Sequence, residues 1–341
     1  MRSRHATLPI FAAVSWGVMF PVLASALTRV DALNLTTARY VLATAVLLAL
    51  LLAREGVAAL ATQRRGVEVV LLGALGFAGF NTLMNLALGH AAPQQIALFA
   101  ATVPLVTQFV RWARDGVRPR PALLGISLVA LAGVGLVITR GRLDGLGQFG
   151  WGGLLMIGAV LGWAFYTHGA SRFPEWSALR YTTLTAVAGM LAMLAASTVA
   201  DLTGLQHAPA AADLVAIAPQ LAYAVLVAAV LAVLAWNTGV RRLGPADAAL
   251  FMNLVPVATF AVQILRGYRP VAVELVGAGL TIAALVAANL VTRTRSAAPA
   301  TTVPEPVAVV DRPAVVDRSR WSDAEPAHSV GSRGGAAVSS A

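Results

Sequence analysis

Cysteine and lysine are both absent from the 341-residue chain, so all 25 of its basic residues are arginines. Without cysteine there is no disulfide framework, no thiolate nucleophile and no thiolate metal ligand. Without lysine there is neither the phosphate-binding lysine of a P-loop nor an amine for a Schiff base. These absences remove several enzyme classes, and we expect neither a cofactor nor a metal centre.

Charged residues are also scarce. They make up 12% of the chain, whereas 58% of the residues are hydrophobic. A soluble domain cannot bury so large an apolar share and stay dispersed, so the composition predicts a polytopic membrane protein. The net charge of +10 is spread over short segments without a dense basic patch, which argues against a nucleic-acid partner.

Ten apolar stretches are each long enough, at about 20 residues, to cross a bilayer as a helix. They lie at 8–27, 33–53, 67–89, 94–112, 121–139, 150–170, 178–200, 214–238, 246–265 and 271–291. Residues 293–341 are rich in Ala, Pro, Ser and Thr. Because such a segment cannot bury enough apolar surface to fold, we expect it to be a disordered cytoplasmic tail.

The arginines are unequally distributed over the segments that join these stretches. With a cytoplasmic N-terminus, 13 arginines lie on the inner side, 6 on the outer side and 6 in the tail. This asymmetry follows the positive-inside rule and predicts a multi-pass protein of the inner or plasma membrane with both termini in the cytoplasm. The alternative for the first stretch is a cleaved signal peptide, because a basic start precedes Ala24-Ser25-Ala26.

The second half of the chain repeats features of the first. Asn85, Pro93, Pro104 and Gly125 recur as Asn237, Pro245, Pro256 and Gly277, each 152 residues later. With shorter offsets, Trp16 corresponds to Trp163, and Arg39-Tyr40 corresponds to Arg180-Tyr181. We therefore predict an all-α integral membrane fold of two five-helix repeats, 8–139 and 150–291. Because five is odd, the second repeat is inverted, and such repeats place a substrate site near the midplane between them.

The order of these residues resembles the drug/metabolite transporter superfamily, in its ten-helix EamA-type branch. The resemblance covers about residues 8–291 and rests on Trp-Gly-x-x-Phe at 16–20, arginine at the start of the second helix, prolines in the fourth and ninth, and glycines in the fifth and tenth. It implies export or uptake of small metabolites through a central cavity lined by both halves. One departure is that the Gly-Glu pair often found before the fifth and tenth helices reads Asp115-Gly116 and Gly267-Tyr268 here.

Polar and aromatic side chains within the apolar stretches are the candidate substrate-binding residues, because polar groups in a bilayer face the bundle interior or a wet cavity. The set is Trp16, Phe20, Asn81, Asn85, Trp163, Tyr166, His168, Trp236, Asn237 and Asn253. For each asparagine the alternative is a hydrogen bond between helices. For Trp16 and Trp163 it is the interfacial aromatic belt, and for His168 a structural hydrogen bond.

Three further features carry local predictions. Pro21 has no N–H to offer the carbonyl of Gly17, which lets the first helix bend or line a cavity. Gly158-x-x-x-Gly162 permits the close approach of another helix. Arg39 and Arg180 lie near helix starts, where we expect them to extend to the membrane interface rather than to neutralise an anionic substrate.

A transporter that exports a small metabolite or drug-like molecule by alternating access is the function that these features favour. The alternatives are an integral membrane enzyme and a membrane receptor or structural protein. An enzyme would need a metal cluster or an acid/base pair at one membrane face, and the histidines at 5, 90, 168, 207 and 328 show no ligand spacing. The expected partners are a small-molecule substrate and the lipid bilayer, with a homo-oligomer left open.

Overall fold

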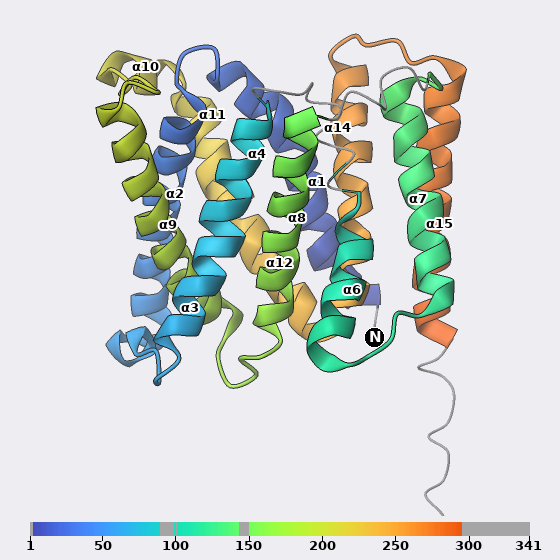
Figure 1. Cartoon of the computed structure of the whole chain (residues 1–341), viewed down its shortest axis with the longest axis horizontal. Helices are drawn as coiled ribbons and strands as arrows, with labels where there is room; N and C mark the ends of the chain where they lie inside the picture. The colour runs from blue at the N-terminus through green and yellow to red at the C-terminus, as the bar shows by residue number, and fades with distance from the viewer. Residues whose placement is uncertain (1–2, 89–98, 100, 143–149, 295–341) are drawn as a thin grey trace, which may run out of the picture. The chain divides into compact units, whose positions relative to one another are not determined.

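The computed structural model describes residues 3–88, 99, 101–142 and 150–294. Within these residues every regular element is helical (Figure 1). Seven helices are long and apolar enough to cross a membrane, and Pro121–Val137 and Ala272–Ala288 are shorter apolar helices at two more of the predicted spans. The predicted span 94–112 lies partly outside the described residues, as does the predicted tail from residue 295 onward. The fold is thus the predicted all-α membrane fold.

The first half runs from α1 to α7. Its described elements are α1 (Ser3–Ala26), α2 (Ala32–Glu55), the 3-10 turn η1 (Val57–Leu60), α3 (Gly66–Gly73), the π-helical segment η2 (Ala74–Gly79), α4 (Phe80–Leu88), α6 (Val103–Asp115) and α7 (Pro121–Thr139). The elements α3, η2 and α4 follow one another without a break and form one membrane span.

The second half runs from α8 to α15. Its elements are α8 (Gly150–Ala170), α9 (Ala178–Leu202), α10 (Ala211–Ala216), α11 (Ala218–Ala222), the π-helical segment η4 (Tyr223–Leu231), α12 (Ala232–Leu243), α13 (Pro245–Ala249), the 3-10 segment η5 (Leu250–Asn253), α14 (Leu254–Leu265) and α15 (Ala272–Thr294). Its third span likewise contains a π-helical segment.

The two halves are repeats of opposite orientation. In Figure 1, α1 and α8 run in opposite directions, and the start of α1 lies at the same end of the bundle as the end of α15. The π-helical segments coincide between the repeats, because η2 ends at Gly79 and η4 ends at Leu231, 152 residues later. π-Helical turns are rare and recur at functional sites, so a matched pair strengthens the correspondence.

Each half places its first helix among the helices of the other half. Helix α1 packs against α12 and α14, and α8 packs in the same way against α4 and α6. Helices α2 and α9 pack against each other, and α9 also contacts α3. Residues from both halves therefore share one large apolar core that surrounds the centre of the bundle.

Pro21 leaves the carbonyl of Gly17 without its intrahelical donor, as predicted. The hydroxyl of Thr259 on α14 replaces that donor with a 2.8 Å hydrogen bond. Gly17 also lets the two helices approach closely, because a Cβ at this position would lie 2.5 Å from the Cβ of Ala258. The proline and the glycine together attach α1 to a helix of the other half.

The prolines of the fourth and ninth spans differ from this pattern. Pro104 lies in the first turn of α6, where no helical hydrogen bond is lost. Its repeat equivalent, Pro256, is the third residue of α14 and directly follows the 3-10 segment η5. The ninth span therefore changes its helical form beside its proline.

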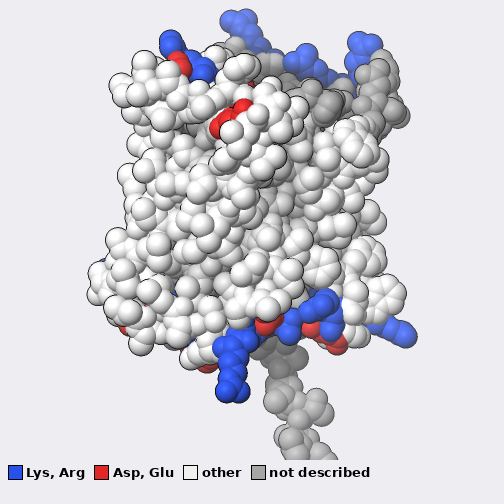
Figure 2. All heavy atoms as spheres, turned by 60° about the vertical axis from the view of Figure 1, so that its left-hand side comes forward, with Lys and Arg blue, Asp and Glu red and all other residues white. Residues whose placement is uncertain are grey.

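The outer surface is apolar between two charged ends. On the face drawn in Figure 2, arginine, aspartate and glutamate side chains gather at the top and bottom, with a broad band that lacks these charged residues between them. Large apolar side chains such as Leu128, Trp151 and Leu194 are exposed on the outside of the helices. A continuous apolar band of this kind suits lipid and not water, so the protein is a multi-pass membrane protein.

The repeat predicts the sidedness of two sites. A reporter fused at residue 145 should be periplasmic, and one fused after residue 295 should be cytoplasmic, because an odd number of spans separates them. Paired alkaline phosphatase and fluorescent-protein fusions measure this directly. If both fusions report the same side of the membrane, the inverted arrangement of five spans is wrong.

Candidate functional site

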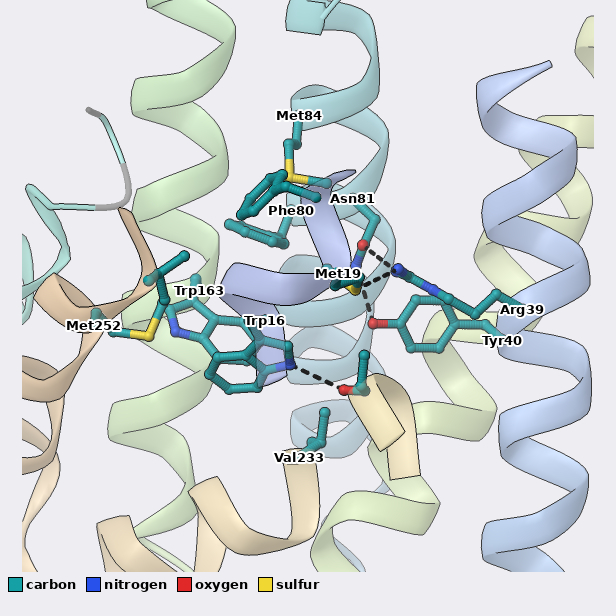
Figure 3. A pocket seen from close by; sticks show the side chains of 13 residues that line it. Trp16, Met19, Arg39, Tyr40, Phe80, Asn81, Met84, Trp163, Val233 and Met252 are labelled. Atoms are coloured by element: carbon teal, nitrogen blue, oxygen red, sulfur yellow. Dashed lines mark hydrogen bonds between the residues drawn. The ribbon is translucent and has the colours of Figure 1, made fainter. Parts of the chain in front are cut away.

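A cavity lies where the two halves meet, and side chains from both halves line it (Figure 3). Its lining residues are Trp16, Met19 and Phe20 of α1; Arg39 and Tyr40 of α2; Phe80, Asn81 and Met84 of α4; Trp163 of α8; Ala228 of η4; Val233 of α12; Met252 of η5; and Val255 of α14. The cavity volume is about 50 Å³. Small-molecule pockets usually measure about 300–1,000 Å³, so the cavity in this structure is smaller than such a pocket.

Aromatic rings form most of one wall. The rings of Trp16 and Trp163, the two repeat-related tryptophans, meet edge to face with centroids 5.4 Å apart. Phe80 lies 5.4 Å from Trp163, and Trp236 lies 5.5 Å behind Trp16. Both tryptophans of the first helices are thus inside the bundle and not in an interfacial belt, and they give the cavity an apolar aromatic wall.

The two tryptophans differ in their N–H groups. The indole N–H of Trp16 donates a 2.9 Å hydrogen bond to the carbonyl oxygen of Ala228, within the π-helical segment η4. The indole N–H of Trp163 is buried and has no acceptor among the described residues. An unsatisfied buried donor is costly, so this N–H of Trp163 still calls for an acceptor.

Arg39 supplies the only charge among the lining residues. One terminal nitrogen donates a 2.6 Å hydrogen bond to the side-chain oxygen of Asn81, and the other contacts the sulfur of Met19 at 3.2 Å. The amide of Asn81 donates in turn to the carbonyl of Phe77 at 2.7 Å and to the hydroxyl of Tyr40 at 3.3 Å. Asn81 therefore fixes the position of the guanidinium, as Figure 3 shows.

The prediction that Arg39 extends to the membrane interface is wrong. Its side chain is 3% exposed and points inward. The N-cap residue of α2 is Asp31, so Arg39 lies two turns inside the helix rather than at its end. Arg180, the repeat equivalent, is partly exposed; it donates to the carbonyl of Ala61 at 2.6 Å and lies over the Trp176 ring.

Four of the ten predicted site residues line the cavity: Trp16, Phe20, Asn81 and Trp163. Three others form a separate buried network beside it. The amide of Asn237 donates to the hydroxyls of Tyr166 and Thr182 at 2.6 and 2.7 Å, and the indole of Trp236 donates to Thr167 at 3.3 Å. These contacts join α12 to α8 and α9 and favour the helix-linking role of Asn237.

The remaining three predicted residues are not among the lining side chains. His168 lies in the last turn of α8, with its Nε2 atom 3.3 Å from a carboxylate oxygen of Asp115 but without the alignment of a hydrogen bond. Asn253 is buried in η5, and its side-chain oxygen has no partner in the described part of the chain. The side chain of Asn85 lies outside the described residues.

Polar contacts join the two halves at both ends of the bundle. At the end near the start of α1, Glu68 of α3 pairs with Arg172 at 3.0 Å, and Arg65 pairs with Glu175 at 3.3 Å. At the opposite end, Asn34 of α2 donates to Asp201 of α9 at 2.9 Å. Both ends are therefore held together in this structure, which agrees with the small volume of the cavity.

Comparison with known proteins identifies the fold. The EamA-like transporter family model matches the chain twice, at residues 5–139 and 150–290. The chain belongs to the EamA-like transporter family. These two matches correspond to the two halves that pack around the cavity.

Two curated relatives come from Bacillus subtilis (strain 168). The uncharacterized transporter YrdR is 30% identical over 290 residues, which are 83% of this chain and 90% of YrdR. The uncharacterized transporter YyaM is 29% identical over 260 residues, which are 75% of this chain and 83% of YyaM. A solved crystal structure of another protein, 22% identical, has a TM-score of 0.70 and covers 86% of this chain and 100% of that one, which shows a shared fold.

Several lining residues were absent from the sequence-based set: Met19, Tyr40, Phe80, Met84, Ala228, Val233, Met252 and Val255. Most of these are methionines, small residues and valines, which are found both on lipid-facing helix surfaces and in cavities. Their residue type therefore does not indicate which of the two they face. Arg39 did carry one, because Asp31 is a good helix N-cap and places Arg39 two turns inside a span. Within the described residues, no group of three or more His, Asp or Glu side chains is arranged to hold a metal ion.

Proposed function

We propose that this protein carries a small metabolite or drug-like molecule across the cell membrane through the cavity between its two halves. One observation carries the proposal: Trp16 and Trp163, from the first helices of the two repeats, meet edge to face in the wall of a cavity that also holds Arg39. Rings with a few fixed polar groups are the usual lining of a small-molecule site. Membership in a transporter family supports the same function.

Alternating access is the proposed mechanism. The halves are inverted repeats, and polar contacts between them occur at both ends of the bundle. In the proposed cycle, the contacts at one end part while those at the other hold, so that the cavity opens to one side at a time. The small cavity in this structure corresponds to the state in which neither end is open.

Flux from liposomes tests the function. Purified protein is reconstituted into liposomes loaded with a small-molecule extract of its host, and mass spectrometry identifies the molecules that leave. We expect Trp163→Ala to reduce this flux at least tenfold, because it removes a wall of the cavity. Trp151→Ala is the matched control on the same helix, since Trp151 is 64% exposed, and it should leave the flux unchanged.

The same samples separate a transporter from an enzyme. A transporter releases molecules of unchanged mass, whereas an enzyme produces new masses inside the liposomes. New products without protein-dependent release would replace the transport proposal by an enzymatic one. Protein-dependent release that Trp163→Ala leaves intact would instead move the pathway away from this cavity.

Export is the proposed direction, with both termini in the cytoplasm. Everted membrane vesicles should then accumulate the molecule identified in the liposome experiment, because their outer surface is the cytoplasmic face. Right-side-out vesicles should accumulate it less than everted ones. The reverse ratio would establish uptake.

A further inference from the structure

Arg39 is a charged group held inside the membrane region, and it has no charged partner among the described residues. Its guanidinium contacts a neutral amide, a thioether and the face of the Tyr40 ring, with 4.6 Å from its central carbon to the ring centroid. No ion pair in the described part of the chain includes it. Its Nε atom is buried and has no hydrogen-bond partner among the described residues.

The charge cannot be removed by losing a proton, because arginine stays protonated in proteins. A buried charge in a membrane protein is costly, and the cost falls only when an opposite charge or strong acceptors compensate it. Asn81 accepts one hydrogen bond and leaves the positive charge in place. A neutral side chain could donate the hydrogen bond that Asn81 accepts, so this hydrogen bond alone does not explain the positive charge.

The other polar groups of the cavity also call for a ligand that accepts hydrogen bonds. The Trp163 indole N–H is a second buried donor without an acceptor. The side-chain oxygen of Asn81 and the carbonyl of Ala228 already accept hydrogen bonds from Arg39 and Trp16. The groups left for a ligand are therefore donors, and the ligand that complements them presents acceptors and negative charge.

The repeat shows that this arrangement is specific to one half. Arg180, the repeat equivalent of Arg39, directs its guanidinium to the backbone carbonyl of Ala61 and to the Trp176 ring, at the end of a helix. Val233 stands 152 residues after Asn81 and offers no hydrogen bond. Among the residues that the structure describes, the buried arginine of this pair is thus Arg39 alone, on the cavity side of α2.

We propose that the transported molecule is a small organic anion: a carboxylate on an apolar or aromatic body, with the carboxylate at Arg39 and the body against the rings of Trp16, Phe80 and Trp163. This substrate class rests on the proposed transport function. The planar guanidinium suits a carboxylate because its N–H groups form a fork that matches the two oxygens. A cationic ligand would meet the charge of Arg39 and be repelled.

Matched pairs of probes test the charge without knowledge of the natural substrate. Each pair is a carboxylate and its neutral primary amide: phenylacetate with phenylacetamide, and cyclohexanecarboxylate with cyclohexanecarboxamide. Binding to the purified protein is measured by quenching of tryptophan fluorescence, since two tryptophans line the cavity, and by calorimetry. We expect wild-type protein to prefer the carboxylates by about 10- to 100-fold, the range of one charge-assisted contact.

Three variants assign that preference to Arg39. Arg39→Gln should abolish it while the amides bind within about threefold of wild type, and Arg39→Lys should keep part of it because the charge remains. Arg180→Gln is the matched control and should behave as wild type. Melting temperatures verify folding, and if Arg39→Gln fails to fold, the comparison of wild type with Arg39→Lys and Arg180→Gln still decides the question.

Equal affinity for both members of each pair in wild-type protein, or a carboxylate preference that survives in Arg39→Gln, overturns the proposal. So does the absence of binding by both carboxylates at millimolar concentration. These outcomes leave the transport function standing if the liposomes still release molecules of unchanged mass. Failure of that release in protein that prefers carboxylates would instead overturn transport and keep the anion site.

Discussion

Replacing Gly73 by alanine is expected to lower the apparent melting temperature of the purified protein by about 5–10 °C. Gly73 ends α3 and faces α9 across the boundary between the two halves. A Cβ at this position would lie 2.3 Å from the backbone carbonyl oxygen of Thr185 and 2.9 Å from the Cβ of Ala188. Because the nearest atom is backbone, the two helices would have to move apart.

Gly189 gives the same contact from the other helix. A Cβ on Gly189 would lie 2.8 Å from the carbonyl oxygen of Gly73 and 2.5 Å from the Cβ of Phe77. Small residues of this kind let membrane helices pack backbone to backbone. The contact lies directly before the π-helical segment η2, so a displaced α3 would also displace Asn81 and the guanidinium that Asn81 holds.

Gly125→Ala is the matched control. Gly125 lies inside α7, and no atom of a neighbouring element lies within 4 Å of a Cβ built there. Alanine in an open helical position stabilises the helix by up to about 1 kcal/mol relative to glycine. The melting temperature should therefore stay the same or rise slightly. If Gly73→Ala and Gly125→Ala have the same melting temperature, α3 and α9 do not pack through their glycines.

The sequence indicated two positions, Pro21 and Gly162, at which a missing atom affects the packing. Pro21 lacks an N–H, and the hydroxyl of Thr259 donates to the carbonyl of Gly17 in its place. Gly162 lacks a side chain, and a Cβ there would lie 2.6 Å from the carbonyl oxygen of Leu75, which confirms the close approach expected of its glycine pair. A missing N–H leaves one carbonyl without a donor, and a missing side chain leaves room for one close contact. The residue type alone therefore indicates where a neighbouring helix can supply a donor or approach closely.

The sequence did not predict the two π-helical segments. The segments η2 and η4 are ordinary apolar runs, ALGFAG and YAVLVAAVL, without a proline. Both segments contact the other half: Gly76 makes room for the Tyr166 side chain, and Ala228 accepts from Trp16. Contacts between residues so distant in sequence leave no local pattern, although the constant offset between the repeats does predict that a feature of one recurs in the other.

Residue type also failed to separate the members of repeated pairs. Arg39 and Arg180 occupy equivalent positions, yet one is buried beside the cavity and the other caps a loop carbonyl near the surface. The difference arises from the neighbouring elements that each arginine contacts, and the residues next to it in the sequence do not indicate these. For the same reason His168 was a candidate substrate-binding residue and instead lies beside Asp115, at the end of its helix.

Asn237 is where the sequence-based interpretation and the structure lead to different experiments. Its repeat position and neighbouring Trp236 predict a substrate contact, whereas the structure gives its amide two hydrogen bonds, to Tyr166 and Thr182, away from the lining residues. We expect Asn237→Leu to lose about 1–3 kcal/mol of stability, because two buried hydroxyls lose their partner. Its affinity for phenylacetate should stay within about twofold of wild type.

Asn81→Leu is expected to weaken phenylacetate binding as well as to lower stability, and both variants are therefore measured on parallel preparations by melting temperature and by phenylacetate affinity. Leucine has a similar volume but cannot accept from Arg39, so the guanidinium loses the 2.6 Å contact that positions it. A hydrogen bond to a charged group amounts to about 1.5–3 kcal/mol, which corresponds to an affinity loss of about 10- to 100-fold. If Asn237→Leu weakens binding while its melting temperature stays at the wild-type value, Asn237 contacts the substrate. The site then extends from the cavity into the Tyr166 network, because a hydrogen bond that only links helices cannot alter affinity without altering stability.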